Sequence, residues 1–361
     1  MSTIIQIVQH LRPGGIETMA LDLLSFGSKS NTCYIISLED TFENAVIRWP
    51  RLAPFKNNLF FLNKKPGFQP SLFSSLFRLF QSLDPIAIHT HHIGPLIYAG
   101  ISGRAFGIPS HVHTEHDAWH LDDRKQRKLQ KYALKIANPT LVADSESVAK
   151  DLGNYIKNRP ISIIRNGINT EYFIPGNKNI SRRFLHLPLD KKIIGCSGRM
   201  EPVKGQHFLL DALRLLSDDI HLAIAGSGSQ EINLKNQARA LNIENRVHFL
   251  GHLDNMNSFY QSLDVFCLPS LNEGFPLSPL EAQSCGIRTV VTNVGGSIET
   301  VCPKTGDTVE KENPIALSLG LLHILNMPKS LIPRDFAKKH GNVTNMVAEY
   351  SQLLLKPSCL L

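Results

Sequence analysis

The stretch DVFCLPSLNEGFPLSPLEAQSCG, from Asp264 to Gly286, passes from an apolar run through a turn into a helical pattern. The run VFCL is typical of a strand that is buried on both faces, and a proline directly after Ser278 is typical of a helix start. Two glutamates, Glu273 and Glu281, bracket the turn. A strand that ends in a turn and a helix is the repeating unit of an α/β fold.

Two explanations fit the glutamates. Ser278 and Glu281 match the S-x-x-E capping box, in which case Glu273 is a solvated loop residue. Alternatively, the helix start presents free backbone N–H groups to an anion, and the carboxylates accept hydrogen bonds from hydroxyls nearby.

The same strand–turn–helix pattern recurs along the chain. The first half contains IIQIV, IAIH and TLVA, and the second contains KKIIGCSG, HLAIAG, RVHFLG and RTVVT after a polar stretch that begins at Arg165. This alternation predicts an α/β protein of two Rossmann-like, doubly wound domains that face a cleft. We expect an N-terminal domain at residues 1–170, a C-terminal domain at 171–340 and a last segment at 341–361.

Composition supports a globular chain with reduced thiols. The chain has 361 residues, a length at which proteins usually divide into more than one hydrophobic core, and 42% of the residues are hydrophobic. No apolar run is long enough for a membrane span, and MSTIIQIV is typical of a first strand rather than a signal peptide. The cysteines form no C-x-x-C pair and predict a cytoplasmic protein; they are Cys33, Cys196, Cys267, Cys285, Cys302 and Cys359.

Charged and glycine-rich segments follow strands of the second half. Arg199 and Lys204 come after KKIIGCS and could clamp a diphosphate, although an isolated pair of this kind is more often solvated. Gly226 begins a G-x-G after HLAIA that lacks the third glycine of the dinucleotide fingerprint. Together with the turn at Glu273, these segments predict a nucleoside diphosphate site for a hydroxyl-rich ligand.

The chain resembles the retaining nucleotide-sugar glycosyltransferases of family 4, whose two-domain fold is called GT-B. The resemblance covers nearly the whole chain, and its most specific part is E-x7-E together with the Arg/Lys pair. The matching motifs are GRMEPVKG at Gly198, the G-x-G at Gly226, VHFLG at Val247, EGFPLSPLE at Glu273, NVGGSIE at Asn293, GGIE at Gly14, HTHH at His89, HVHTEH at His111 and IIRNGI at Ile163.

The resemblance implies that domain 1–170 binds the acceptor, that domain 171–340 binds the nucleotide sugar, and that a C-terminal helix within 341–361 returns to the first domain. It also implies a role for each site residue. Glu281 would accept the ribose hydroxyls, Glu273 the hydroxyls of the donor sugar, and Arg199 with Lys204 would neutralise the diphosphate. His113 would lie near the donor sugar and the acceptor as a further catalytic group. The donor-binding set is Gly15, Arg199, Lys204, Gly226, Glu273, Gly274, Phe275, Pro276, Leu277, Ser278 and Glu281. No cofactor is expected.

Histidines gather at two strand ends, in HTHH and HVHTEH. Such spacings can hold zinc, but structural zinc sites need four ligands and no cysteine lies near. We therefore expect no metal, and treat His89, His91, His92 and His116 as ordinary polar residues at strand ends.

The segment from Leu121 to Asn138 predicts a helix with one basic side. Its basic residues are Arg124, Lys125, Arg127, Lys128, Lys131 and Lys135. The net charge of +7, most of it in the first half, fits either a solvated face or contact with an anionic membrane. A protein bound peripherally to the inner face of the cytoplasmic membrane is one expectation.

These patterns favour a retaining hexosyltransferase of surface polysaccharide assembly. A UDP-sugar is the favoured donor, with GDP-mannose as the alternative, and the acceptor is lipid-linked or a saccharide. The rivals are a sugar-nucleotide epimerase or a phosphorylase on the same fold, a non-catalytic partner subunit, and a nucleic-acid binder. Intact Arg199, Lys204, Glu273 and Glu281 argue against the subunit, and no nucleic-acid recognition module is found.

Overall fold

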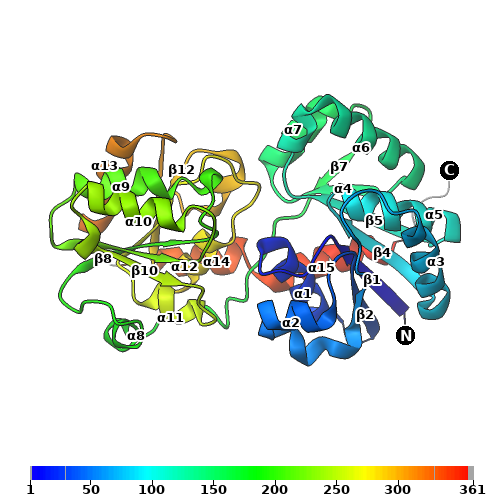
Figure 1. Cartoon of the computed structure of the whole chain (residues 1–361), viewed down its shortest axis with the longest axis horizontal. Coiled ribbons are helices and arrows are strands. Elements are labelled where there is room, and N and C mark those ends of the chain that lie inside the picture. Colours follow the sequence, from blue (N-terminus) through cyan, green and yellow to red (C-terminus); the bar gives the residue numbers. More distant parts are fainter. Residues whose placement is uncertain (1, 29, 329, 357–361) are drawn as a thin grey trace. The chain divides into compact units, whose positions relative to one another are not determined.

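The computed structural model describes residues 2–28, 30–328 and 330–356, so Cys359 lies outside the described residues. The chain divides into two compact units, one of Met1–Asn166 with Val343–Leu361 and one of Gly167–Asn342 (Figure 1). The division falls within the turn Arg165-Asn166-Gly167. Because the last helix belongs to the first unit, the chain passes between the units twice.

The first unit is built on a parallel sheet with the strand order β3-β2-β1-β4-β5-β6-β7. β1 and β2 pair in register from Ser2 opposite Asn31 to Val8 opposite Ser37. The strands are β1 (Ser2–Val8), β2 (Asn31–Ser37), β3 (Leu59–Phe61), β4 (Pro85–His91), β5 (Ser110–Glu115), β6 (Thr140–Ala143) and β7 (Ile161–Ile163).

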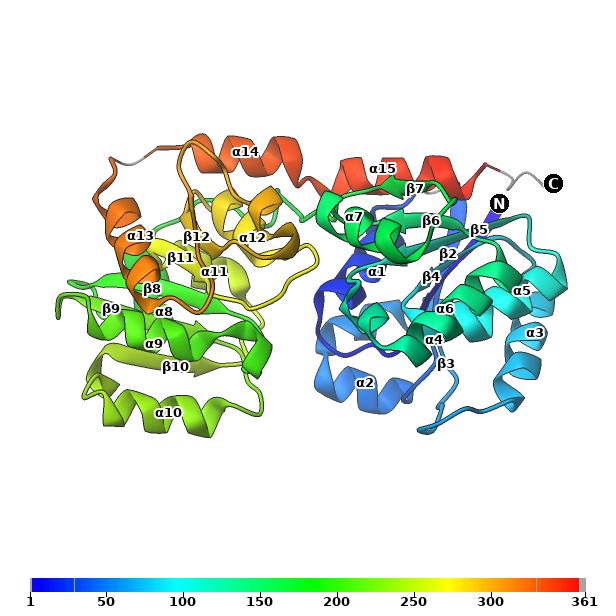
Figure 2. The same cartoon turned by 90° about the horizontal axis from the view of Figure 1, so that it is seen from above.

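Helices cover both faces of this sheet (Figure 2). Met19 of α1 and Val347 of α15 share one core cluster with Ile4 of β1, while Leu76 of α3 packs in another with Ile88 of β4. The helices are α1 (Gly15–Phe26), α2 (Phe42–Arg48), η1 (Pro50–Asn58), α3 (Ser71–Leu83), α4 (Ile93–Pro95), η2 (Leu96–Gly100), α5 (Ile101–Phe106), η3 (Trp119–Asp122), α6 (Arg124–Ala137), α7 (Glu146–Tyr155) and α15 (Val343–Leu354).

The second unit repeats this plan with the strand order β10-β9-β8-β11-β12-β13. Its pairs are also parallel, and β8 has β9 on one side and β11 on the other, so the strand order reverses there. The strands are β8 (Lys192–Ser197), β9 (Ile220–Ala225), β10 (Val247–Gly251), β11 (Val265–Leu268), β12 (Arg288–Thr292) and β13 (Asp307–Val309).

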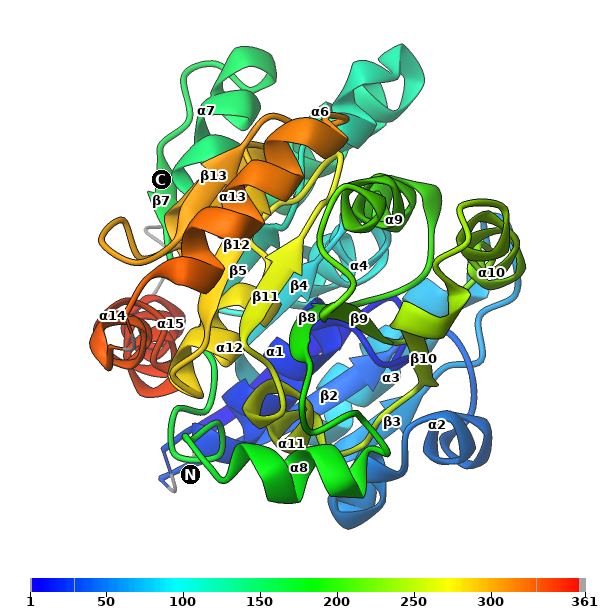
Figure 3. The same ribbon diagram turned by 90° about the vertical axis from the view of Figure 1, so that its left-hand side faces the viewer.

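Figure 3 shows α9, α10 and α13 over one face of the second sheet and α11, α12 and α14 over the other. Each face has its own core cluster, with Leu209 and Leu321 in one and Phe259 and Leu280 in the other. The helices are α8 (Lys178–Phe184), η4 (Pro202–Lys204), α9 (Gln206–Arg214), α10 (Glu231–Ala240), η5 (Glu244–Arg246), α11 (Met256–Gln261), α12 (Ser278–Ser284), η6 (Gly295–Thr300), α13 (Pro314–Asn326) and α14 (Ile332–His340).

The predicted fold class, two doubly wound α/β domains, is confirmed. The apolar runs named above all form strands. The strands that the patterns did not predict are short or polar: β3, β7 and β13 have three residues each, and β2 begins with Asn31 and Thr32.

A buried arginine ties α8 to the second sheet and provides a test of this core. The Arg182 side chain donates to Ser262 O at 2.9 Å and binds Asp264 Oδ2 at 2.6 Å, and that carboxylate also accepts Ile193 N of β8. We expect Arg182→Met to lower the free energy of unfolding by about 1–3 kcal/mol, because the carbonyls of Ser262, Leu189 and Lys191 lose their donor. Asp264 keeps its contact with Lys178, so no buried charge is left without a partner. The exposed neighbour provides the control, since Arg183→Met should change it by less than about 0.5 kcal/mol. Equal shifts of the urea midpoint in the two variants would contradict this assignment.

Candidate functional site

The loops that follow β8, β9, β11 and β12 form one layer at the carboxyl edge of the second sheet. Met200 N donates to Ser227 O at 2.9 Å, and Gly296 N donates to Gly274 O at 2.9 Å. The loops therefore support one another through backbone bonds. Because the strand order reverses at β8, this edge is where sheets of this kind bind ligands.

Glycine is required where these loops touch. At Gly295 φ is +48°, and a Cβ would lie 1.8 Å from Glu273 O. At Gly226 φ is +133°, and a Cβ would lie 2.1 Å from Gly198 O. No side chain can be added at either position without moving a backbone carbonyl. The predicted donor residue Gly226 thus has a steric role.

Lys204 and Glu273, predicted from separate motifs, meet in this layer. Lys204 Nζ lies 2.6 Å from Glu273 Oε1, and their side chains are 21% and 9% exposed. Ser270 Oγ donates to the same carboxylate oxygen at 2.6 Å. The site thus holds a cation and a carboxylate in direct contact. Sequence reasoning missed Ser270, although it lies three residues before Glu273.

Arg199 lies in the same loop as Lys204, after β8, with an exposed side chain, and its carbonyl accepts a hydrogen bond from Gln206 Nε2 at 3.0 Å. Hydrogen bonds from the side chain and backbone of Ser229, together with the charge of Arg199, hold the pKa of Glu201 below its ordinary value. The loops after β8 and β9 are therefore joined through side chains as well as backbone.

Glu281 lies on α12 and is held by a buried tyrosine. Tyr260 OH donates to Glu281 Oε2 at 2.5 Å and lies 3.2 Å from Ser197 Oγ. Burial and the charge of Glu281 raise the pKa of Tyr260 well above its ordinary value, so the phenol stays a donor. Tyr260 lies on α11, outside every motif of the sequence. Only the fold shows that it is the partner of Glu281.

The capping-box explanation of Ser278 is wrong. Ser278 is the first residue inside α12, no side chain caps the helix, and Glu281 binds Tyr260 instead. Gly274, Phe275 and Pro276 are buried, whereas Leu277 and Ser278 are half-buried. Because α12 has only seven residues, its N-terminus alone makes a weak anion site, and the two cations must supply most of the positive charge.

His113 does not have the surroundings expected of a group that touches substrate. Its side chain is fully buried within β5, with Nδ1 2.9 Å from Thr90 Oγ1 and Nε2 2.7 Å from Glu115 Oε1. With both ring nitrogens bound and no exposed surface, its prediction as a direct catalytic group is corrected to a structural position. His116, the first residue after β5, is the histidine at the strand's carboxyl end.

The other histidines of these motifs form a network inside the first unit. His89 lies 2.8 Å from Thr114, which in turn bonds Tyr350 of α15, and His91 lies 3.1 Å from His116. Among the described residues, no group of three or more His, Cys, Asp or Glu is arranged to hold a metal ion. The network therefore ties α15 to the sheet.

Gly15, the remaining predicted donor residue, is the first residue of α1, at the carboxyl end of β1. A Cβ there would meet nothing within 4 Å, so the fold itself does not require glycine. A Cβ at the neighbouring Gly14 would lie 2.3 Å from Glu17 Oε2, the end of a flexible side chain, so this contact does not by itself require glycine either.

The predicted basic helix is α6. Arg124, Lys125 and Lys128 are exposed, but Arg127 is half-buried, with its guanidinium 5.3 Å from the ring centre of Tyr155. Three apolar side chains are also exposed on α6, namely Leu129 (50%), Tyr132 (67%) and Ile136 (51%). Nowhere in the described residues is a helix both long and apolar enough to span a bilayer.

Comparison with known families covers most of the chain. Residues 13–172 match the model described as Glycosyltransferase Family 4, and residues 177–340 match the model described as Glycosyl transferases group 1. These two regions correspond to the two units of the structure.

Individual relatives and a solved structure agree with the family matches. The chain is 31% identical over 240 residues to an Escherichia coli UDP-Gal:alpha-D-GlcNAc-diphosphoundecaprenol alpha-1,3-galactosyltransferase, covering 62% of each chain. It is 33% identical to a Corynebacterium urealyticum D-inositol 3-phosphate glycosyltransferase, covering 50% of this chain and 47% of that one. Anabaena HepE in complex with UDP and glucose superposes with a TM-score of 0.84 at 20% identity, covering 98% and 99% of the two chains.

The buried histidines make the first unit sensitive to acid. Burial, with smaller effects of neighbouring histidines, lowers the pKa of His89 and His91 well below the ordinary value and that of His111 to about 3. These groups stay neutral in the folded state and become protonated only on unfolding. The free energy of unfolding is therefore not reduced by these histidines above the unfolded pKa of about 6.5. Below that pH it falls by about 1.4 kcal/mol per pH unit for each histidine.

We expect the urea midpoint to fall between pH 7 and pH 5, and His111→Gln to make this fall less steep. The exposed His252 provides the control, because His252→Gln should leave the pH dependence unchanged. A midpoint that is constant from pH 7 to pH 5 in the wild type would contradict this account.

Proposed function

Because this chain belongs to the group 1 glycosyl transferases of family 4, we propose that it transfers a sugar from a nucleoside diphosphate sugar to an acceptor hydroxyl. The observation that carries the proposal is the contact of 2.6 Å between Lys204 and Glu273. In a sugar nucleotide the terminal phosphate is bonded directly to the sugar, so the ligand needs a cation and a hydroxyl acceptor side by side. The Lys204–Glu273 pair offers both at the carboxyl edge of the sheet.

Each site residue has a role in this proposal. Lys204 and the exposed Arg199 neutralise the diphosphate, with help from the backbone N–H groups between Phe275 and Ser278. Glu273 accepts hydrogen bonds from the sugar hydroxyls. Glu281, fixed by Tyr260, accepts them from the ribose. A charge-assisted hydrogen bond of this kind is stronger than a neutral one, which favours carboxylates at both positions.

The reaction would retain the configuration at the anomeric carbon. The bond between that carbon and the diphosphate oxygen breaks as the acceptor oxygen bonds to the same face, and the acceptor proton passes to the departing diphosphate. Lys204 and Arg199 stabilise the charge that develops on the leaving group. His113 supports Glu115 and Thr90 inside the first unit.

We further propose a UDP-sugar as the donor, with GDP-mannose as the alternative. The relative named for UDP-Gal and the neighbour solved with UDP support this choice. A lipid-linked acceptor in surface polysaccharide assembly agrees with the diphosphoundecaprenol substrate in the name of the first relative. A phosphorylated polyol is the second candidate, supported by the name of the other relative.

Association with the inner face of the cytoplasmic membrane would give access to a lipid-linked acceptor. On α6, Lys128, Lys131 and Lys135 follow one another at spacings of three and four residues, and Leu129, Tyr132 and Ile136 do the same in the adjacent row. Residues at these spacings lie along one side of a helix. An exposed apolar row beside a row of lysines suits the boundary between lipid headgroups and acyl chains.

The transfer reaction is tested at Lys204. Lys204→Ala should lower turnover about 10² to 10³-fold, as the loss of one preorganised charge donor typically does. Lys192→Ala removes an exposed lysine at the start of β8, the opposite end of that strand, and should leave turnover unchanged. Release of nucleoside diphosphate from the donor is the measurement. Wild-type turnover in folded Lys204→Ala protein would overturn the assignment, and nucleotide binding without transfer by the wild type would favour a non-catalytic subunit.

Substitutions of the two glutamates should affect different steps, nucleotide binding at Glu281 and sugar transfer at Glu273. Glu281→Gln should weaken the binding of free nucleoside diphosphate, because the ribose loses its charged acceptor. Glu273→Gln should keep that affinity, since it leaves Lys204 without its carboxylate partner and available to phosphate, but it should damage sugar transfer. Calorimetry with the free nucleotide measures the difference, and equal losses of affinity in both variants would refute the division of roles.

A further inference from the structure

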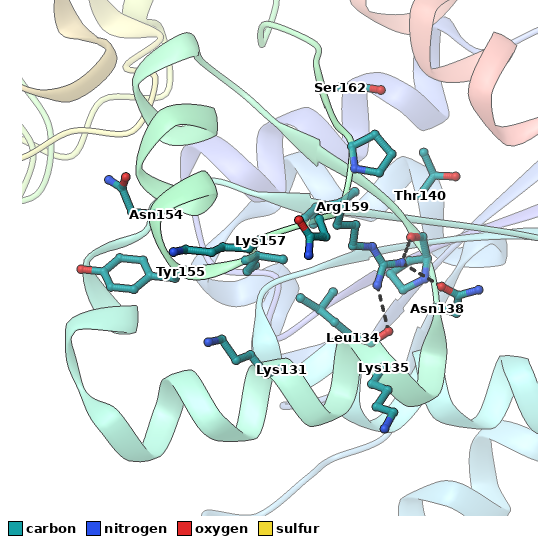
Figure 4. Close-up of a pocket in the computed structure, with 15 residues that line it drawn as sticks. Lys131, Leu134, Lys135, Asn138, Thr140, Asn154, Tyr155, Lys157, Arg159 and Ser162 are labelled. Carbon is teal, nitrogen blue, oxygen red and sulfur yellow. Dashed lines mark hydrogen bonds between the residues drawn. The ribbon is translucent and has the colours of Figure 1, made fainter.

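A pocket of about 910 Å³ opens in the first unit between α6 and the segment that joins α7 to β7 (Figure 4). Its lining includes Pro139 and Thr140 at the start of β6 and Pro160 before β7. The pocket therefore lies at the amino ends of these strands, whereas the site residues after β1 and β5 lie at carboxyl ends. It is a separate feature from the proposed donor site, which lies in the second unit.

The pocket is basic. Lys131 and Lys135 of α6 line it together with Lys157 and Arg159 of the joining segment, and no Asp or Glu is among its described lining residues. Asn138, Asn154 and Asn158 add side-chain amides that can donate hydrogen bonds. The pocket thus offers positive charge and neutral donors, which is the chemistry that recognises a phosphate group.

Basic residues near a helix C-terminus often serve only to satisfy its last carbonyls. Here Arg159 serves that purpose, because its guanidinium donates to Leu134 O at 3.1 Å, to Asn138 Oδ1 at 3.2 Å and to Pro139 O (Figure 4). The three lysines form no ion pair with any carboxylate of the described chain. Their charge exceeds what capping α6 requires.

We propose that this pocket binds the phosphate of an anionic phospholipid headgroup while the exposed face of α6 lies on the bilayer. Lys131 and Lys135 belong both to the pocket and to the row beside the exposed Leu129, Tyr132 and Ile136. A headgroup in the pocket would therefore be continuous with an apolar surface suited to acyl chains. This inference rests on the membrane association proposed above and names the lipid chemistry that it uses.

The test uses the whole chain and dihexanoyl phosphatidylglycerol, kept below its micelle concentration so that no charged surface forms. Calorimetry should detect binding that weakens at least tenfold in Lys131→Gln and in Lys157→Gln. Matched controls remove the same charge outside the pocket, from α6 itself and from α7, which precedes the joining segment. Lys125→Gln on α6 and Lys150→Gln on α7, which are both exposed, should change the affinity less than twofold. Equal losses in pocket and control variants would overturn the site.

A second arm separates the sources of the phosphate. Glycerol phosphate carries the headgroup chemistry without acyl chains, so it should bind at least tenfold more weakly than the lipid. Equal or tighter binding of glycerol phosphate would assign the pocket to a soluble phosphate ester and overturn the lipid proposal. No binding of either probe would overturn the pocket itself. The affinity for nucleoside diphosphate should stay unchanged in all four variants, so a failure here leaves the proposed donor site intact.

Discussion

The close approach of backbone at the carboxyl edge of the second sheet is the constraint on which the rest of the site depends. Glu273 O would lie 1.8 Å from a Cβ at position 295, and Gly198 O would lie 2.1 Å from one at position 226. These contacts leave the loops after β8, β9, β11 and β12 little freedom to move apart. The Lys204–Glu273 pair is formed across two of these loops, so its geometry is set by the backbone before any ligand binds.

Preorganisation explains why a charged pair can persist in a half-buried place. Removing two charged groups from water costs free energy, and only a well-aligned pair with additional hydrogen bonds compensates for that cost. Ser270 supplies such a bond to Glu273, and Tyr260 supplies one to Glu281. A site arranged in this way needs little reorganisation when charge develops on a departing diphosphate, which is the condition for electrostatic stabilisation of a transition state.

The first unit uses polar residues differently. Its buried histidines bind one another, hydroxyls of the sheet and carboxylates, and Tyr350 extends the network to α15. Burial keeps several of them neutral near pH 7. The network therefore contributes to specifying how the last helix packs, at the expense of stability in acid.

Sequence patterns predicted those parts of the structure that depend on local order along the chain. Apolar runs followed by turns identified most strands, and the E-x7-E spacing with Lys204 identified the charged site. The patterns could not identify partners that come from distant elements, such as Tyr260 on α11 for Glu281. They also could not show that His113 is fully buried with both ring nitrogens bonded, because a histidine in a strand has the same spacing whether it is buried or exposed. The prediction that Ser278 caps α12 was wrong because the spacing does not fix the first residue of a helix, and α12 begins at Ser278 rather than after it.

The most direct test of the central claim is amide hydrogen exchange of the whole chain with and without saturating UDP, and then with other nucleoside diphosphates. A nucleotide that binds in the loop layer should slow exchange in the segments 198–205, 226–230 and 269–281 of the second unit, because it restricts their local opening. The account predicts this pattern for at least one nucleotide, with little change in the first unit near α6. Binding that slows exchange elsewhere and leaves these three segments unchanged would contradict it.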